Sequence, residues 1–165
     1  AGFSLCAVSE KISKKSDSLL NKGYYFDLKT YDKSYAKYQT PTTPSIAHLF
    51  GLKYVLHKIS VEGLENRWKR HIDMANYTRE WALNHGQLFF PEKGCESYTL
   101  TCIKNVQNWD INALNERLLA RGFRMDRGYG DLRCKAFRIA HMGNIYFEDL
   151  KEYLNLIDEF IPEIA

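Results

Sequence analysis

Ala136-Phe137-Arg138-Ile139-Ala140-His141-Met142-Gly143 is a short apolar run with one arginine near its centre. Its length and apolar content predict a buried strand. A guanidinium is not stable in such a strand without an acceptor, because an unpaired buried charge costs several kcal/mol. Arg138 therefore either pairs with an acidic side chain of its own fold, for which Glu148 and Asp149 are candidates, or binds an anion from outside. A carboxylate suits the second role because its two oxygens match the planar guanidinium.

The segments around this strand predict an α+β fold. Short strands are expected at residues 87–90, 98–103, 123–126 and 137–141. A helix capped by Asp110 is expected to end at Gly122, and a last helix over about 147–161 repeats apolar residues at helical spacing. Short strands with two helices on one face form an α+β layer.

Two further helices precede the strands. The first begins at Thr42-Thr43-Pro44, where proline fits the first helical position, and it continues to about Ile59. Ser60 can cap the second, which is expected over 61–84 and ends at Gly86. The apolar positions expected to form its buried face are Leu64, Trp68, Ile72 and Ala75. The exposed face is expected to carry charged residues that include Arg67, Lys69 and Arg70.

The beginning of the chain has a different character. A strand is expected over Phe3 to Val8, a short polar helix from Ser9, an extended run over 24–28 and a loop over 31–43. The chain starts in an apolar run without an initiator methionine, so we expect a fragment or a processed chain. A change of composition near Ser60 predicts a domain boundary there.

Composition excludes several classes of function. The 165 residues carry a net charge of +3, with 45% hydrophobic and 26% charged residues, as in soluble globular proteins. No nucleic-acid partner is expected from interspersed charges, and no apolar run approaches the roughly 20 residues that span a membrane. The four cysteines form no C-x-x-C pair and follow no secretion signal, so reduced thiols in the cytoplasm are expected. The histidines show no metal-binding spacing, so no metal site is expected.

Two loops remain as candidate sites. Gln39-Thr40-Pro41-Thr42-Thr43-Pro44 is either an ordinary helix cap or an anion site, where free N–H groups and the side chains of Gln39 and Thr42 hold a phosphate. Gly128-Tyr129-Gly130 is interpreted as a turn or as a mobile loop over a site. It does not support nucleotide binding, because no helix follows at the required spacing.

Three segments in series resemble the C-terminal part of class V pyridoxal-phosphate aminotransferases, on the alanine–glyoxylate and serine–pyruvate branch. These segments are residues 39–44, Gly63 to His71, and Phe137 to Gly143. Tyr25-Phe26-Asp27-Leu28-Lys29 also fits, and the resemblance covers essentially the whole chain.

The resemblance implies a domain layout and a set of site residues. Residues 1–61 would be the C-terminal remnant of the large α/β cofactor-binding domain. Residues 62–165 would be the small C-terminal domain of a fold-type I enzyme, a short and mostly antiparallel sheet with helices on one face. Arg138 would hold the α-carboxylate of the substrate. Gln39 and Thr42 would reach the phosphate of the pyridoxal phosphate bound by the neighbouring subunit of a homodimer.

The function implied by the resemblance is transfer of an amino group from alanine or serine to a 2-oxo acid such as glyoxylate or pyruvate. The Schiff-base lysine of that family would precede Ala1, so no catalytic residue is expected in the chain, which should be inactive alone. Two alternatives stay open. One is a cysteine desulfurase or lyase of the same superfamily, although the segment around Cys134 is unlike the cysteine loop of desulfurases. The other is a stand-alone, non-catalytic α+β interaction module.

Overall fold

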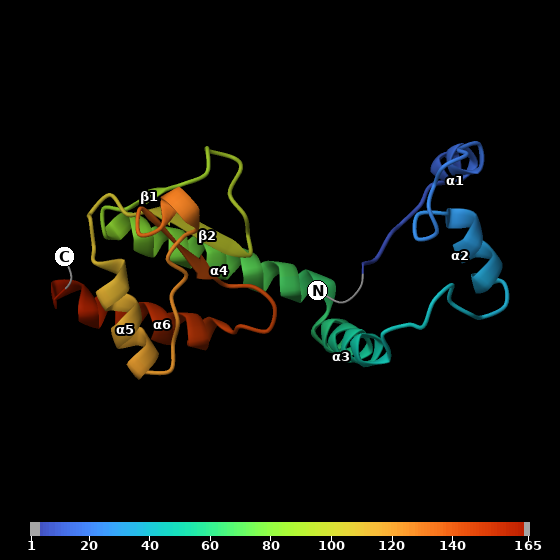
Figure 1. The fold of residues 1–165 in the computed structure, drawn as a ribbon. Coiled ribbons are helices and arrows are strands. Elements are labelled where there is room, and N and C mark those ends of the chain that lie inside the picture. Colours follow the sequence, from blue (N-terminus) through green and yellow to red (C-terminus); the bar gives the residue numbers. More distant parts are fainter. Residues whose placement is uncertain (1–3, 164–165) are drawn as a thin grey trace. The chain divides into compact units, whose positions relative to one another are not determined.

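The computed structural model describes residues 4–163, and the chain divides into two compact units after Val61 (Figure 1). The first unit contains helices α1 (Glu10–Asp17) and α2 (Leu28–Tyr35) and nearly all of α3 (Ile46–Glu62). Ser9 caps α1 by accepting from the Ile12 N–H, and the Asp27 carboxylate caps α2. Helix α1 thus confirms the predicted polar helix.

Other expectations for the first unit are wrong. Residues 4–8 form no strand, and Phe3 lies outside the described residues. The expected extended run over 24–28 is a turn, and α2 occupies part of the expected loop. Asp27 explains both differences, because its carboxylate accepts from the Lys29 N–H and the Thr30 hydroxyl and so starts a helix there.

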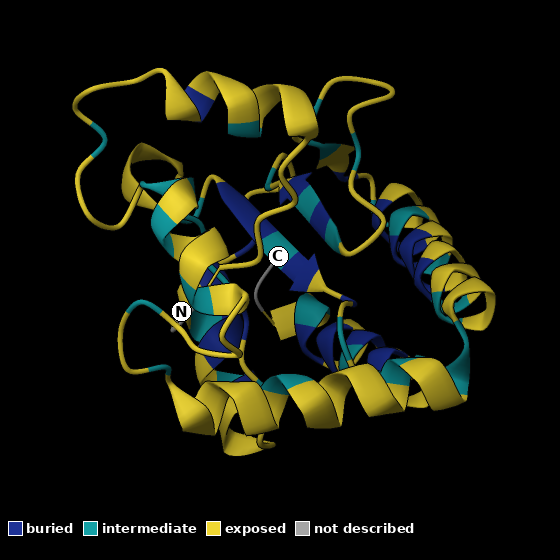
Figure 2. Ribbon diagram, turned by 90° about the vertical axis from the view of Figure 1, so that its right-hand side faces the viewer, coloured by how far each residue is buried: buried dark blue, intermediate teal, exposed yellow. Residues whose placement is uncertain are grey.

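The first unit has almost no interior. Ser16 is the one buried residue between residues 4 and 61, and all the other buried residues described lie in the second unit (Figure 2). Apolar side chains of the first unit are instead exposed, and they include Leu20, Phe26, Tyr38, Ile46, Phe50 and Leu56. Exposed large apolar side chains in such a number are rare on a free-standing monomer.

The boundary between the two long helices α3 and α4 lies three residues later than the sequence predicts. Helix α3 starts at Ile46 rather than Pro44 and runs through Ser60 to Glu62. Gly63 ends it with φ of 82°, a left-handed conformation that favours glycine, and α4 (Leu64–Asn84) begins at the next residue. Ser60 is therefore an internal helical residue and not a cap.

The second unit contains a three-stranded antiparallel sheet in the order β1 (Leu88–Phe89), β2 (Leu100–Lys104), β3 (Ala136–Ala140). The sheet confirms the predicted fold class, with one strand fewer than expected. Residues 123–126 contribute a single bridge, from Asp126 to Arg138. Tight turns around Gly122 and Gly128 leave too few residues for a ladder.

Helices α4, α5 (Ile111–Ala120) and α6 (Phe147–Phe160) bury the sheet on one face. Alternate strand residues face them, as the pleat requires. The core therefore combines strand and helix side chains, among them Ile103, Phe137 and Ile139 from the sheet and Met74, Leu114, Leu118, Leu150 and Leu154 from the helices. The Asp110 carboxylate caps α5 as predicted, by accepting from two backbone N–H groups.

The buried face of α4 differs from the predicted one. Leu64 and Trp68 are 55% and 59% exposed, and of the four predicted positions Ala75 is the one that is buried. The face that packs consists of His71, Met74, Ala75, Thr78, Trp81 and Ala82. The apolar residues in the first two turns of α4 do not pack against the core of this unit. Their spacing in the sequence is the same as that of core residues, so periodicity alone cannot distinguish the two.

Candidate functional site

Arg138 lies at the centre of β3 and faces away from the helices. Its neighbours Phe137 and Ile139 are fully buried in the core, so alternation places the arginine on the other face of the sheet. Its side chain is 29% exposed. Cys102 of β2 lies directly opposite in the antiparallel register.

Asp126 is the ion-pair partner of Arg138. Its Oδ2 accepts from Nη2 of the arginine, and its backbone carbonyl accepts from the Arg138 N–H at 3.1 Å. The hydrogen bond from the guanidinium lowers the pKa of the Asp126 carboxyl below its usual range. The expectation of an internal partner is confirmed, but the expected candidates Glu148 and Asp149 are wrong. Asp149 instead accepts from the Tyr146 N–H at 2.9 Å, at the start of α6.

The guanidinium retains capacity for a ligand. Its Nε is buried and has no hydrogen-bond partner within residues 4–163, and its centre lies 4.7 Å from the centroid of the Tyr129 ring. A pocket of about 440 Å³ opens beside it. The polar side chains that line this pocket are Arg124, Asp126, Arg138, Asn144, Asp149 and Tyr153.

A tight loop holds Asp126 and Tyr129 against the arginine. The Gly128 N–H donates to Oδ1 of Asp126 at 3.0 Å, and Cys134 N–H closes the loop on the Arg127 carbonyl at 2.8 Å. Gly128 has φ of 79°, and a Cβ there would lie 2.6 Å from the Leu132 carbonyl oxygen. The predicted turn at 128–130 is therefore a close backbone crossing that only glycine fits.

Arg70 fixes the other wall of the pocket. Its guanidinium donates to the carbonyl oxygens of Gly143 and Ile145, which follow β3, and to the carboxylate of Glu62. Arg67 donates to the same carboxylate, and these bonds, from Arg70 first, lower the pKa of Glu62 to about 2. Both arginines are only 14% exposed, so their expected place on the exposed helix face is wrong. No sequence pattern predicts that Arg70 binds the Gly143 carbonyl, which is 73 residues away.

His141 is buried where β3 ends. Its Nε2 lies 2.9 Å from the Thr101 hydroxyl, and the side chain has no exposed surface. Burial lowers the pKa of His141 to about 4, so the imidazole is neutral at physiological pH. The sequence placed this residue at the end of the strand without predicting its partner.

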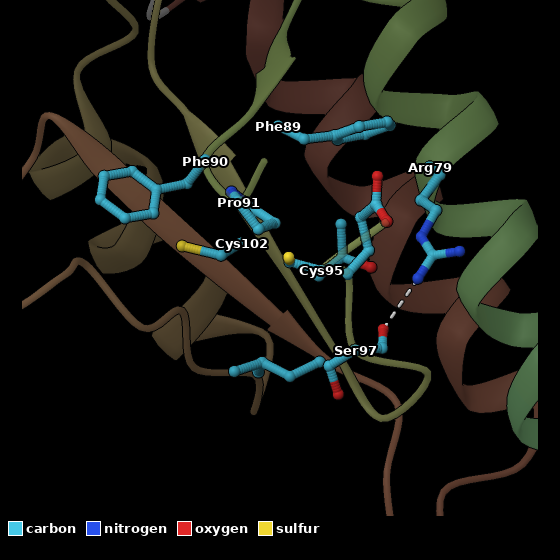
Figure 3. Close-up of a pocket in the computed structure, with 10 residues that line it drawn as sticks. Arg79, Phe89, Phe90, Pro91, Cys95, Ser97 and Cys102 are labelled. Carbon is cyan, nitrogen blue, oxygen red and sulfur yellow. Dashed lines mark hydrogen bonds between the residues drawn. The ribbon is translucent and has the colours of Figure 1, made fainter. Parts of the chain in front are cut away.

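A second pocket, of about 170 Å³, lies beside β1 and β2 (Figure 3). Phe89, Phe90 and Pro91 make it mainly apolar, and Arg79 at its rim donates to the Ser97 carbonyl at 2.9 Å. Burial raises the pKa of the Cys102 thiol in this pocket. Across residues 4–163, no three His, Cys, Asp or Glu side chains gather as metal ligands, and no helix has the length and apolarity needed to cross a bilayer.

Gln39 and Thr42 lie in the first unit, before α3, and the structure does not place them relative to Arg138. Both are exposed, and neither side chain forms a hydrogen bond to another described residue. The Gln39 N–H donates to the Ser34 carbonyl, and the Thr42 carbonyl accepts from the Thr40 hydroxyl, so the backbone of this loop is held. Its free side-chain donors fit the requirements of a phosphate group.

Several known proteins similar to this chain are named as aminotransferases, although no protein-family model matches it. An uncharacterized aminotransferase of Methanocaldococcus jannaschii is 35% identical over 147 residues, which cover 86% of the chain and 38% of that protein. Serine–glyoxylate aminotransferase of Arabidopsis thaliana is 30% identical over 87% of the chain and 37% of its own length.

Among solved structures, alanine–glyoxylate aminotransferase from Nostoc sp. matches with a TM-score of 0.78 and 26% identity. The match covers 92% of the chain and 41% of that enzyme. The chain thus spans well under half the length of each relative. The shared fold and the identities over most of the chain agree with the resemblance carried by the three sequence segments. In sequence and fold the chain is thus similar to class V pyridoxal-phosphate aminotransferases, and its matches are consistent with the C-terminal part of those enzymes.

Proposed function

We propose that the whole protein to which this chain belongs transfers an amino group from alanine or serine to glyoxylate or pyruvate. The relatives named for serine–glyoxylate and alanine–glyoxylate transfer support this proposal. The observation that carries it in this chain is Arg138, an arginine fixed in mid-strand that lines a pocket and whose buried Nε has no hydrogen-bond partner among residues 4–163. A guanidinium held in this way is suited to orient the carboxylate that amino acids and 2-oxo acids share.

Pyridoxal phosphate is the proposed cofactor, and it supplies the electron sink for amino transfer when bound. Gln39 and Thr42 would hold its phosphate through their side-chain donors, across the interface of a homodimer. The free donors of this loop and the exposed apolar surface of the first unit support both parts of this proposal. The four free cysteines support a cytoplasmic location.

We also propose that residues 1–165 alone do not catalyse amino transfer. The lysine that binds the cofactor in this family has no counterpart in the chain, since Lys11, Lys14 and Lys15 do not match its place in the family pattern. Incubation of the purified chain with pyridoxal phosphate, alanine and glyoxylate should give no pyruvate above a protein-free control. Pyruvate formation in proportion to the chain concentration would contradict this.

The role of Arg138 is tested in the whole protein by Arg138→Gln. Loss of a charge-assisted contact of about 1.5–3 kcal/mol should raise KM for the amino acid roughly tenfold to hundredfold. Arg121→Gln is the matched control, because Arg121 is an exposed arginine whose ion pair with Glu159 spans 3.6 Å. An unchanged KM in the Arg138 variant would remove this residue from substrate binding.

The two alternatives receive less support. A desulfurase needs an exposed, activated cysteine, whereas Cys134 packs against the hydrophobic core of the second unit. A stand-alone interaction module would cover its own apolar residues, yet those of the first unit are exposed.

A further inference from the structure

Arg138, the residue proposed to bind the substrate carboxylate, already binds the carboxylate of Asp126. Oδ2 of Asp126 accepts from Nη2 of Arg138, while Nε of the same guanidinium is buried and unpartnered in the described chain. A carboxylate ligand binds best when it accepts from two guanidinium N–H groups at once. The charge of Asp126 already offsets that of Arg138, and a ligand carboxylate that takes the same Nη2 group must share it with the Asp126 oxygen or displace that oxygen.

We propose that Asp126 is a specificity-determining residue of the Arg138 site, where it acts as an internal competitor for the ligand carboxylate. This inference rests on the proposed function of Arg138. Asp126 is suited to compete because the loop fixes it, through the 3.0 Å bond from the Gly128 N–H to its Oδ1 and the backbone bridge to Arg138. Its ion pair is only partly screened, since the two side chains are 35% and 29% exposed.

The charges that line the pocket determine which carboxylate ligands Asp126 disfavours most. Two arginines, Arg124 and Arg138, face two carboxylates, Asp126 and Asp149, so the pocket is neutral overall. A neutral pocket offers little attraction to a second carboxylate on a ligand. Asp126 therefore lowers affinity for every carboxylate and lowers it most for dicarboxylates, which favours small monocarboxylic substrates.

Asp126→Asn tests this with little change in shape. Asparagine keeps an oxygen that can accept from the Gly128 N–H and removes the charge that faces Arg138. Asp131→Asn is the control, because Asp131 belongs to the same loop, in the 3-10 helix η1 (Gly130–Leu132), and does not line the pocket. Asp126→Ser is a second variant in case asparagine impairs folding, and circular dichroism checks the fold of each.

The measurement is a titration of the full 165-residue chain with propionate and succinate, followed through the Arg138 Nε–H nuclear magnetic resonance signal. Removing the competing charge should tighten propionate binding about tenfold, because a hydrogen bond to a charged group is worth roughly that factor or more. Succinate should gain more than propionate, and Asp131→Asn should change neither. Equal dissociation constants for the unsubstituted chain and the folded Asp126 variants would overturn the inference.

A further arm needs no substitution at Asp126. Saturating succinate should shift the Gly128 amide signal together with Arg138 Nε–H, because displaced Asp126 changes its bond to Gly128. A Gly128 signal that stays fixed while Arg138 responds would also overturn the inference.

The variant Arg138→Gln separates the proposed carboxylate-binding role of Arg138 from the proposed competing role of Asp126. If it binds both probes as well as the unsubstituted chain, the proposed role of Arg138 fails. If it loses binding while Asp126→Asn changes nothing, only the role of Asp126 fails.

Discussion

Glu62, the last residue of α3, and Arg70, two turns into α4, form an ion pair with Nε–Oε1 at 2.7 Å across the left-handed turn at Gly63. The same guanidinium donates to the Gly143 carbonyl in the loop that follows the Arg138 strand. One half-buried arginine thus joins a helix junction to a wall of the candidate pocket.

Replacing Arg70 by alanine should destabilise the second unit. The substitution leaves the Gly143 and Ile145 carbonyls without this donor and leaves the Glu62 carboxylate with Arg67 alone. An acceptor that loses its donor away from water costs about 1–3 kcal/mol. Urea unfolding followed by tryptophan fluorescence measures the change, since Trp81 and Trp109 are core residues of this unit. Lys69→Ala is the control, because the Lys69–Asp73 pair is exposed and should change stability by no more than about 0.5 kcal/mol. Equal losses in the two variants would contradict the role of Arg70.

The pH dependence of stability should report Glu62. Its pKa is about 2 in the folded chain against an ordinary value of 4.5, so its ion pairs stabilise the fold fully above pH 4.5. That contribution is lost as the pH falls from 4.5 towards 2, because over this range the unfolded state binds a proton at Glu62 while Arg70 and Arg67 keep the folded carboxylate ionised. The difference in unfolding free energy between the unsubstituted chain and Glu62→Gln should therefore shrink over this range. A difference that stays constant from pH 5 to pH 2.5 would exclude Glu62 as the source.

His141 should determine how the stability of the fold depends on pH in a second, higher pH range. The folded imidazole has a pKa of about 4 and the unfolded one about 6.5, so the unfolded state binds more protons between these values. Stability should fall as the pH drops from 6.5 towards 4. In the double variant His141→Leu with Thr101→Val, which removes both partners of the 2.9 Å bond, this slope should be reduced. An undiminished slope would show that another group titrates.

Gly128→Ala should destabilise the loop that holds Asp126. The new Cβ would lie 2.6 Å and 2.7 Å from two carbonyl oxygens, of Leu132 and Ala136, at a φ that disfavours side chains. Strain of this kind costs on the order of 1–3 kcal/mol or more. Gly130→Ala is the control, since Gly130 also has positive φ but has open space around its would-be Cβ. Thermal melting should show the larger loss for Gly128, and equal losses would exclude the close approach as the cause.

Sequence patterns predicted what depends on local spacing. The apolar run around Arg138 is β3, the helical repeat after 147 is α6, and Asp110 caps α5, because each depends on residues within one or two turns. The patterns also indicated that Arg138 needs an acceptor. They did not identify Asp126, which lies 12 positions before Arg138 in the sequence, across a loop whose path depends on Gly128.

The remaining errors have a common physical origin. The first turns of α4 and helix α3 contain apolar residues at helical spacing. Such spacing indicates a surface that packs against another one, but it does not identify the partner. Leu64 and Trp68 were therefore predicted as core residues of this domain, and both are exposed. Arg67 and Arg70 were predicted as solvated because charged residues usually are. Both instead bind Glu62, and Arg70 also binds the distant carbonyls of Gly143 and Ile145.

The scarcity of buried side chains in the first unit has a calorimetric consequence. The heat-capacity increment of unfolding follows the apolar area that becomes hydrated, and residues 4–61 have little such area left to expose. In a scanning experiment on the whole chain, the excess heat and the heat-capacity step should therefore come almost entirely from residues 62–163. The step should fall well below the average expected for 165 residues.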